Sequence, residues 1–339
     1  MFYDYPIFFE RNRVYRVYKG GKLFSGLFGD EPEDGNYPEE WIASDVHAVQ
    51  EKSAGPHEGV SKIKGEDLYL DEAIEKYKTE IIGNRSEWGI LTKALDSAIR
   101  LPMQAHPDKA FSKKYFNSNH GKEESWIVLD TRPGAKVFYE FKDGVTIDEF
   151  SAAIDKSEND AGVMETLVKS MPVKKGDVIF IPGKMVHAIG AGCLMLEVQE
   201  PSDWTVQPER WCGDHRLTDK EMTLGLDRQT ALKCFDVNMR YPHPQKPITE
   251  KNEDGVLYES LIDERNTKEF IVHRITLKDG KYDMNLPGSV YIVIEGEAAI
   301  TGDGYEKEVK KGDYFVISAA AEGKYSISGN AQIIECWKK

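Results

Sequence analysis

The chain has 339 residues, of which 40% are hydrophobic and 11% aromatic, enough apolar material for one large core or two packed ones. Its 44 Lys and Arg residues are outnumbered by 58 Asp and Glu residues, so the formal net charge is −14 at pH 7. A surface of this sign repels a phosphate backbone, which argues against nucleic acid as a partner.

The longest apolar runs, such as residues 178–182 and 290–294, have the length of a strand and fall far short of the roughly 20 residues of a membrane span. The first 13 residues contain acidic side chains and no small-residue cleavage site, so they do not resemble a signal peptide. We therefore expect a cytoplasmic protein that binds no membrane and is a monomer or a homodimer.

Helical periodicity first occurs at residues 71–82, and we expect it to continue through residues 86–99. A second helical insertion is predicted near residues 146–172, because the capping box of Thr146 and Glu149 precedes a periodic apolar pattern. A third helical segment is predicted near residues 214–235, and three prolines then interrupt the chain before residue 248.

One strand–turn–strand unit occurs twice in the chain. Lys174-Lys175-Gly176-Asp177, followed by an apolar strand, is repeated as Lys310-Lys311-Gly312-Asp313, followed by another. Short strands separated by glycine turns predict a mainly β fold of tandem jelly-roll barrels with helical insertions. We expect one domain over residues 1–245 and a second over residues 246–339.

Polar side chains in the first half interrupt strands that should be apolar. Gln104 and His106 are two residues apart, so they face the same side of a strand. One of the carboxylates Glu123 and Glu124 must also point inward, just before the next apolar run. His187 follows the segment from Gly176 to Pro182, and this spacing resembles the second sequence motif of the cupin superfamily.

Imidazole, amide and carboxylate groups together form a nitrogen and oxygen ligand set. Such a set suits Zn, Mn, Co, Ni or Fe, and it leaves room for substrate oxygens in a Lewis-acid site. We therefore expect one divalent metal ion per chain. It would lie in a catalytic, metal-binding domain over residues 1–245, and we expect the second domain, over residues 246–339, to be cupin-like and metal-free.

Four segments resemble the type I phosphomannose isomerases, also called mannose-6-phosphate isomerases, and together they cover much of the first half. They are Gln104-Ala105-His106-Pro107-Asp108-Lys109, Gly121-Lys122-x-Glu124-x-Trp126, Gly176…Pro182…His187-Ala188 and Leu196-Glu197…Ser202-Asp203. The resemblance implies a zinc site formed by Gln104, His106, Glu124 and His187. It also implies that Lys122 and Glu197 are active-site residues.

Two positions depart from the family pattern. Pro102 stands where the family usually has serine, and Gln207 stands where it has an active-site arginine. An amide cannot replace the charge of arginine toward a phosphate. Candidate replacements are Arg210, Lys184 and Lys109.

Three further groups are candidates for the active site, and two of them have alternative roles. Glu197 lies in an apolar run that would raise its pKa toward neutrality, so it is either the general base or a residue that orients a metal ligand. Asp203 either orients an active-site group or caps a turn. His47 is a candidate acid–base group for opening the sugar ring.

The resemblance implies an aldose–ketose isomerase that interconverts mannose 6-phosphate and fructose 6-phosphate through a cis-enediol. Pro102 and Gln207 leave open an isomerase of an unphosphorylated sugar. The absence of the arginine also leaves open a non-catalytic, sugar-binding cupin.

Overall fold

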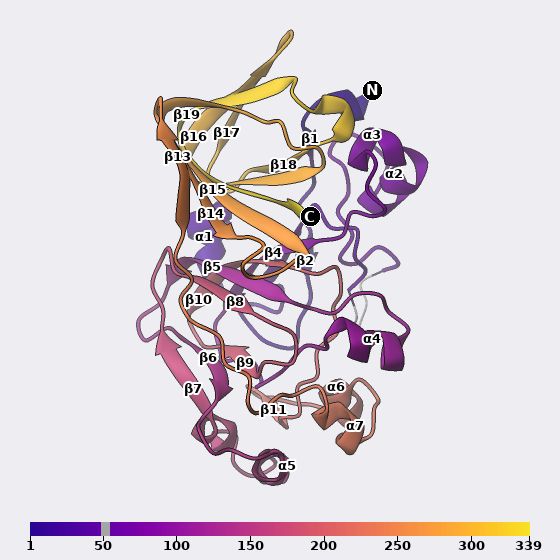
Figure 1. The fold of residues 1–339 in the computed structure, drawn as a ribbon, viewed down its shortest axis with the longest axis vertical. Helices are drawn as coiled ribbons and strands as arrows, with labels where there is room; N and C mark the ends of the chain where they lie inside the picture. Colours follow the sequence, from indigo (N-terminus) through magenta and orange to yellow (C-terminus); the bar gives the residue numbers. More distant parts are fainter. Residues whose placement is uncertain (49–54) are drawn as a thin grey trace.

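The computed structural model describes residues 1–48 and 55–339, and strands make up most of its regular structure (Figure 1). The mainly β fold with helical insertions is therefore confirmed. The strands form two large sheets that belong to different halves of the chain, one above the other in Figure 1.

The first half is built on a six-stranded antiparallel sheet and a smaller, three-stranded one. The six strands, in spatial order, are β2 (Arg13–Val14), β3 (Glu39–Ile42), β4 (Leu91–Ser97), β10 (Cys193–Gln199), β5 (Glu124–Thr131) and β8 (Val178–Ile181). The three are β7 (Val168–Pro172), β6 (Lys136–Phe141) and β9 (His187–Ile189).

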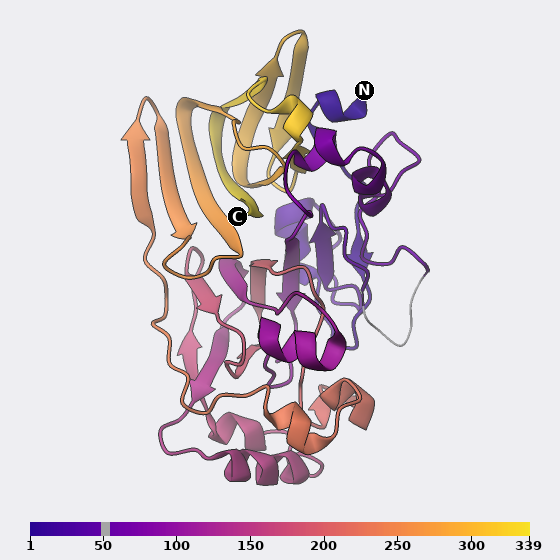
Figure 2. The same cartoon turned by 45° about the vertical axis from the view of Figure 1, so that its right-hand side comes forward.

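The second half contributes an eight-stranded antiparallel sheet, drawn mostly in orange and yellow in Figure 2. Its strands are β1 (Ile7–Phe8), β18 (Tyr314–Ile317), β16 (Ser289–Gly302), β19 (Tyr325–Lys338), β15 (Phe270–Asp283), β14 (Val256–Ile262), β13 (Ile248–Glu253) and β17 (Tyr305–Lys310), which pairs with β16. Strand β1 comes from the extreme N-terminus and pairs with β18, so the start of the chain is built into the second sheet.

The six-stranded sheet is buried on both faces, and alternate side chains enter different cores. On β10, Leu194 and Leu196 pack with Val290 and Ile334 of the second half, so this core joins the two halves. Met195, on the opposite face, packs inside the first barrel. Glu197 has the same parity as Met195, so its carboxylate enters the first barrel as well.

Helices cover the edges of both halves (Figure 1). α2 (Leu70–Lys76) and α3 (Lys78–Ile82) lie beside the second sheet, where α3 packs near Ala319–Ala321. The remaining α-helices are α1 (Ser25–Phe28), α4 (Lys109–Phe116), α5 (Ile147–Lys156), α6 (Asp219–Thr223) and α7 (Arg228–Leu232). Single-turn 3-10 helices lie at Phe2–Asp4, Lys22–Phe24 and Val163–Thr166, and a two-stranded sheet joins β11 (Trp211–Cys212) to β12 (His215–Arg216).

The predicted extension of the first helical region through residues 86–99 is wrong. Strand β4 occupies this segment, and all seven of its residues are buried between two cores. The charges of Lys93 and Asp96 break the alternation that marks a strand, because both side chains are buried with ionic partners. The polar residues that suggested a helical period are therefore buried charges and do not form the solvent-facing side of a helix.

The two other helical predictions are right in place and too long in extent. In the 146–172 segment, α5 is followed by Val163–Thr166 and then by strand β7, because Val168 to Pro172 pair with β6. In the 214–235 segment, the helix is broken into α6 and α7. Leu224 ends α6 in the left-handed region with φ of 54°, which a continuing helix cannot adopt.

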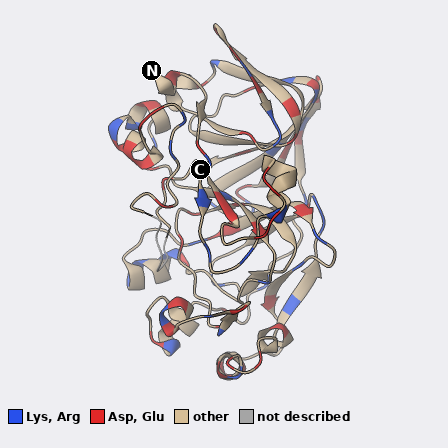
Figure 3. Cartoon of the chain, turned by 180° about the vertical axis from the view of Figure 1, so that it is seen from behind, with Lys and Arg blue, Asp and Glu red and all other residues tan. Residues whose placement is uncertain are grey.

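Acidic and basic residues occur over both halves of the molecule and are not segregated (Figure 3). Within residues 1–48 and 55–339, no helix is both long enough and apolar enough to cross a membrane. The domain boundary near residue 245 stays a prediction. Strand β1 lies before this boundary and pairs with β18, which lies after it.

Candidate functional site

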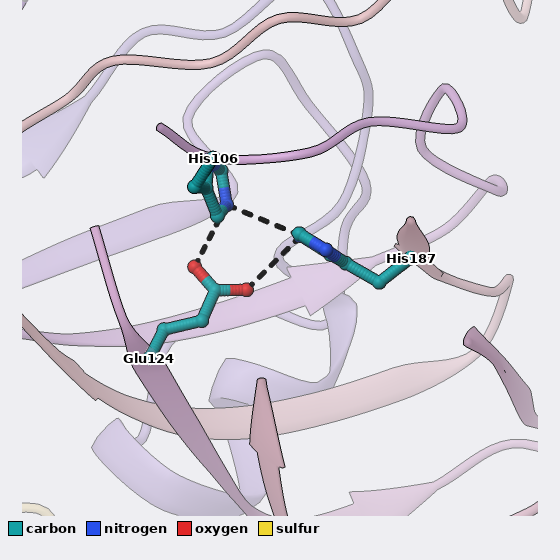
Figure 4. A group of neighbouring side chains, drawn as sticks. All are labelled: His106, Glu124 and His187. Carbon is teal, nitrogen blue, oxygen red and sulfur yellow. Dashed lines mark hydrogen bonds and ion pairs between the residues drawn. The ribbon is translucent and has the colours of Figure 1, made fainter. Parts of the chain in front are cut away.

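Three buried side chains meet at one point inside the first barrel (Figure 4). The Nε2 atoms of His106 and His187 lie 3.1 Å apart. Glu124 spans both rings, with Oε2 2.9 Å from His106 and Oε1 3.2 Å from His187. His106 follows an isolated bridge, Glu124 begins β5 and His187 begins β9, so three separate segments supply the cluster.

The hydrogen bonds of the two imidazoles fix which nitrogen atoms face this point. Nδ1 of His106 donates to the carbonyl of Trp204 over 3.0 Å, and Nδ1 of His187 donates to the carbonyl of Met185 over 2.8 Å. Both Nε2 atoms are therefore acceptors. Burial, together with the nearby Lys122 cation, lowers the pKa of His106 to about 3, so the ring is neutral.

Two imidazole lone pairs and a carboxylate that face one another repel unless a cation lies among them. Oε2 of Glu124 is buried and lacks a hydrogen bond of good geometry within the described residues, although Nε2 of His106 is close. Burial opposes the charge of Glu124, but the Lys122 cation beside it helps to hold its pKa well below the ordinary value. The donor set thus fits a divalent metal ion.

Gln104 is held beside His187 by backbone pairing in both directions. The amide N–H of each residue donates to the carbonyl of the other over 2.9 Å. The side-chain amide of Gln104 consequently lies 3.3 Å from Nε2 of His187. Its oxygen is available to the same point after rotation of the amide group, whose orientation the hydrogen-bond network decides.

A tight turn before β9 brings the two histidine-bearing segments together. Lys184 has a φ of 71°, and its amide N–H donates to the carbonyl of His106 over 2.7 Å. Gly183 precedes it, and a Cβ atom there would lie 3.2 Å from Cα of Asp108. The turn therefore needs glycine to approach the loop that carries His106.

Lys122 is the cation of the cluster. Its side chain is 4% exposed, with Nζ 3.1 Å from Nε2 of His106 and 3.5 Å from Oε2 of Glu124. The carboxylate of Glu200 positions the segment by accepting from the amides of Gly121 and Glu123. Of the two candidate carboxylates, Glu124 enters the cluster, whereas Glu123 points away and accepts from Thr267.

Glu197 lies on the same face of the sheet, directly opposite Trp126 of β5 and Lys93 of β4. Burial and the nearby charge of Glu124 raise its pKa to about 7, with Lys93 and Lys122 acting in the opposite direction. Oε1 is 3.2 Å from Nζ of Lys93 but has no hydrogen bond of good geometry among the described residues. A buried carboxyl group that titrates near neutrality is suited to proton transfer.

A row of buried charges continues from Glu197 and was not predicted from the sequence. Lys93 also lies 3.7 Å from Oε2 of Glu39, and Nε of Arg16 lies 3.0 Å from Oε1 of the same carboxylate. Tyr18 donates to Glu39 over 2.5 Å. The sequence signal for this row is a charged residue at a position of an apolar strand whose side chain points inward. Lys93 is one such residue, and Glu39, two residues before Trp41, is another.

Asp203 joins this row, because its Oδ1 lies 3.2 Å from Nη2 of Arg16. Gln207 lies further along the same segment, where its side-chain amide donates to the carbonyl of Glu221 over 3.4 Å. The structure thus places Asp203 beside a cation and turns the amide of Gln207 toward α6.

Arg210 is not brought to the cluster. Its guanidinium is bound by Glu158, Asp219 and the carbonyl of Leu217. His47 is exposed and contacts Asp71 over 3.2 Å and the carbonyl of Pro56. Their predicted roles in substrate binding therefore find no support in the contacts these residues make.

A jelly-roll barrel that directs two imidazoles, a carboxylate and an amide at one point defines a metal-binding cupin. The family described as "Mannose-6-phosphate isomerase, cupin domain" matches residues 265–337. Mannose-6-phosphate isomerase ManA of Bacillus subtilis is 29% identical over 72% of this chain and 73% of its own length. These matches agree with the resemblance to the mannose-6-phosphate isomerases that the motifs predicted.

A second relative and a solved structure show the same likeness. Mannose-6-phosphate isomerase of Streptococcus mutans is 30% identical over 59% of each chain. The crystal structure of mannose 6-phosphate isomerase from Bacillus subtilis superposes with a TM-score of 0.78, at 23% identity, over 98% of this chain and 99% of that one. This likeness covers both halves and confirms the predicted tandem cupin fold.

Proposed function

We propose that the chain is a metal-dependent aldose–ketose isomerase that interconverts mannose 6-phosphate and fructose 6-phosphate through a cis-enediol. The observation that carries the proposal is the pairing of an acceptor-only cluster, His106, His187 and Glu124, with a carboxyl group of pKa about 7, Glu197, on the same inner face. Isomerisation requires both an electrophile for the sugar oxygens and a base for one proton.

Gln104, His106, Glu124 and His187 would hold the ion, most simply zinc, which accepts nitrogen and oxygen ligands in four-coordinate sites. When bound, the metal supplies Lewis-acid polarisation of the sugar carbonyl. Mn, Co, Ni and Fe accept the same ligand set. The chain's own contribution is to fix the two Nδ1–H tautomers, which keeps both Nε2 lone pairs directed at the ion.

Glu197 acts as the base in this proposal. With a pKa near 7 it is partly ionised at neutral pH, so it accepts the proton from C2 of the open-chain aldose and returns it to C1. Lys122, buried beside Glu124, donates to the oxygen on which negative charge develops.

The relatives' names support mannose 6-phosphate as the substrate. Gln207 and Pro102, at the two positions that depart from the family pattern, instead favour an unphosphorylated sugar such as mannose. The two functions share the metal cluster and Glu197, so they differ only in what binds the far end of the sugar.

Steady-state assays with mannose 6-phosphate and with mannose, each followed in the ketose direction, test the proposal on metal-loaded protein. We expect turnover of mannose 6-phosphate with a kcat/KM far above that for mannose. If only mannose is turned over, the proposal that the substrate is phosphorylated is wrong, whereas the proposed isomerase activity stands.

Exchange of the C2 proton in deuterated water separates an isomerase from a sugar-binding cupin. An isomerase incorporates deuterium at C2 during turnover, whereas a binding protein shows no exchange above the protein-free rate. A cytoplasmic location and a monomer or homodimer remain predictions from the sequence.

A further inference from the structure

The proposed substrate ends in a phosphate dianion, and none of the cations suggested by the sequence is placed to meet it. Arg210 is bound by two carboxylates and a carbonyl outside the cluster. Lys109 is paired with Glu269 over 2.6 Å. Lys184 lines a surface groove with residues of α5 and α7 rather than the buried row of charges.

The buried row itself contains three cations. Lys122 contacts His106 and Glu124 in the metal cluster, and Lys93 lies between Glu39 and Glu197. The third cation, Arg16, ends the row. Its side chain is 13% exposed, against 4% for each of the two lysines, so it is the most accessible of the three.

The guanidinium of Arg16 is held in place with part of its hydrogen-bonding capacity unused. Nε contacts Glu39 and Nη2 contacts Asp203, while the group lies over the ring of Trp41, 5.3 Å from its centroid. The backbone of Arg16 is fixed by two hydrogen bonds with Asn36. Within residues 1–48 and 55–339, Nη1 has no hydrogen-bond acceptor.

Two short routes connect Arg16 to the metal cluster. Asp203 precedes Trp204, whose carbonyl accepts from Nδ1 of His106. On the other side, Lys93 joins Glu39 to Glu197, with its Nζ 3.7 Å from Oε2 of Glu39 and 3.2 Å from Oε1 of Glu197.

The charge of the row also suits an anion once the metal is present. Arg16, Lys93 and Lys122 face four carboxylates, those of Asp203, Glu39, Glu124 and Glu197. A divalent ion adds two positive charges, so five positive charges face four negative ones. The loaded site therefore has a net positive charge and attracts a phosphate group.

We propose that Arg16 binds the phosphate group of the sugar phosphate through its Nη1 edge, which has no acceptor among the described residues, and so sets the preference for phosphorylated over free sugar. The inference rests on the proposed function. In this chain a buried arginine from the N-terminal segment supplies the charge that Gln207 lacks. Arginine suits the role because its planar fork offers two parallel N–H donors to phosphate oxygens.

The test measures kcat/KM for mannose 6-phosphate and for mannose in the wild type and in Arg16→Gln, Arg16→Lys and Arg210→Gln, all loaded with metal. We expect the ratio of the two kcat/KM values to fall by about 100-fold in Arg16→Gln. Arg16→Lys should show a smaller fall, because it keeps the charge and loses the fork. Arg210→Gln, the matched control, should keep the wild-type ratio.

Inhibition of mannose 6-phosphate turnover by inorganic phosphate provides a second measurement of the same site. Phosphate should inhibit the wild type and Arg210→Gln more strongly than Arg16→Lys. If Arg16→Gln fails to fold, Arg16→Lys alone decides the question.

If kcat/KM in Arg16→Gln falls equally for both sugars, Arg16 positions Glu39 and does not bind phosphate. That result would overturn the proposal. An unchanged ratio together with unchanged phosphate inhibition would also overturn it. Failure of the proposed function looks different, because the wild type would then show no turnover of mannose 6-phosphate at all.

Discussion

Nζ of Lys93 lies 3.2 Å from Oε1 of Glu197, the residue directly opposite it on the neighbouring strand. Both side chains are almost completely buried, with exposed fractions of 4% and 3%. Because burial and Glu124 raise the pKa of Glu197, the lysine is the main group that keeps this carboxyl group partly ionised at neutral pH. The cross-strand pair thus sets the proton affinity of the proposed base.

Replacing Lys93 with methionine should move the acidic limb of the activity profile to higher pH. Glu197 accepts a proton only when it is ionised, so activity rises as the pH passes through its pKa. Loss of the neighbouring cation raises that pKa further, by about one to three units. The profile of kcat/KM against pH measures the shift.

Lys136→Met is the matched control, because Lys136 pairs with Glu165 at a half-exposed position remote from Glu197. Its profile should coincide with that of the wild type. An acidic limb that stays in place in Lys93→Met would show that Glu197 is not the group whose ionisation limits the reaction.

Glu197→Gln should lower kcat by about 10²- to 10⁴-fold, the usual contribution of a positioned general base. The amide keeps the shape of the side chain but cannot accept the proton. Metal content should remain at the wild-type level, because Glu197 is not among the clustered ligand atoms. Normal turnover would remove Glu197 from the mechanism, and loss of the metal would reassign it to orienting a ligand.

The metal cluster was predictable from the sequence because its ligands lie in local motifs with fixed spacing. Gln104 and His106 share a strand face, and His187 follows a turn that needs Gly183. The choice between Glu123 and Glu124 needed the family resemblance, since strand alternation shows only that one of them points inward. The structure agrees with that choice through the distances from Glu124 to both imidazoles.

The buried row from Arg16 to Lys93 was not predictable, because its members come from distant parts of the chain. Arg16 meets Asp203 across 187 residues, and no local pattern records such a pairing. The same buried charges led to the wrong helix over residues 86–99. Lys93 and Asp96 imitate the polar face of a helix, whereas their burial depends on partners from other strands.

Removal of one imidazole should abolish metal binding. In His187→Ala, the metal content should fall from about one ion per chain to near zero, because two of the three clustered groups bind too weakly to hold the ion. The matched control is His120→Ala, whose histidine contacts Glu87 and no ligand of the cluster. Elemental analysis after dialysis against a weak chelator gives the measurement.

Metal binding should also raise the free energy of unfolding. An ion at 100 times its dissociation constant adds about 2.7 kcal/mol to the free energy of unfolding. Added zinc should therefore raise the thermal midpoint of the metal-free wild type and of His120→Ala, but not that of His187→Ala. A midpoint that rises equally in all three proteins would place the binding elsewhere.

The second barrel has a buried carboxylate of its own, and its role is predicted to be structural. Glu335 on β19 accepts hydrogen bonds from the hydroxyls of Tyr291, Tyr258 and Tyr282 over 2.6, 2.9 and 3.1 Å. Tyr291→Phe removes the shortest of these bonds and leaves the buried carboxyl group with two donors. The free energy of unfolding should fall by about 2 kcal/mol, since a hydrogen bond to a charged group contributes that much.

Urea unfolding measures this loss, with Tyr305→Phe as the matched control on the neighbouring strand β17. Tyr305 is half-buried and donates no hydrogen bond within the described residues, so its variant should stay within about 0.5 kcal/mol of the wild type. The kcat of Tyr291→Phe at 25 °C should be unchanged, because Tyr291 lies in the core of the second half. A drop in kcat with unchanged stability would show instead that the second barrel takes part in the reaction.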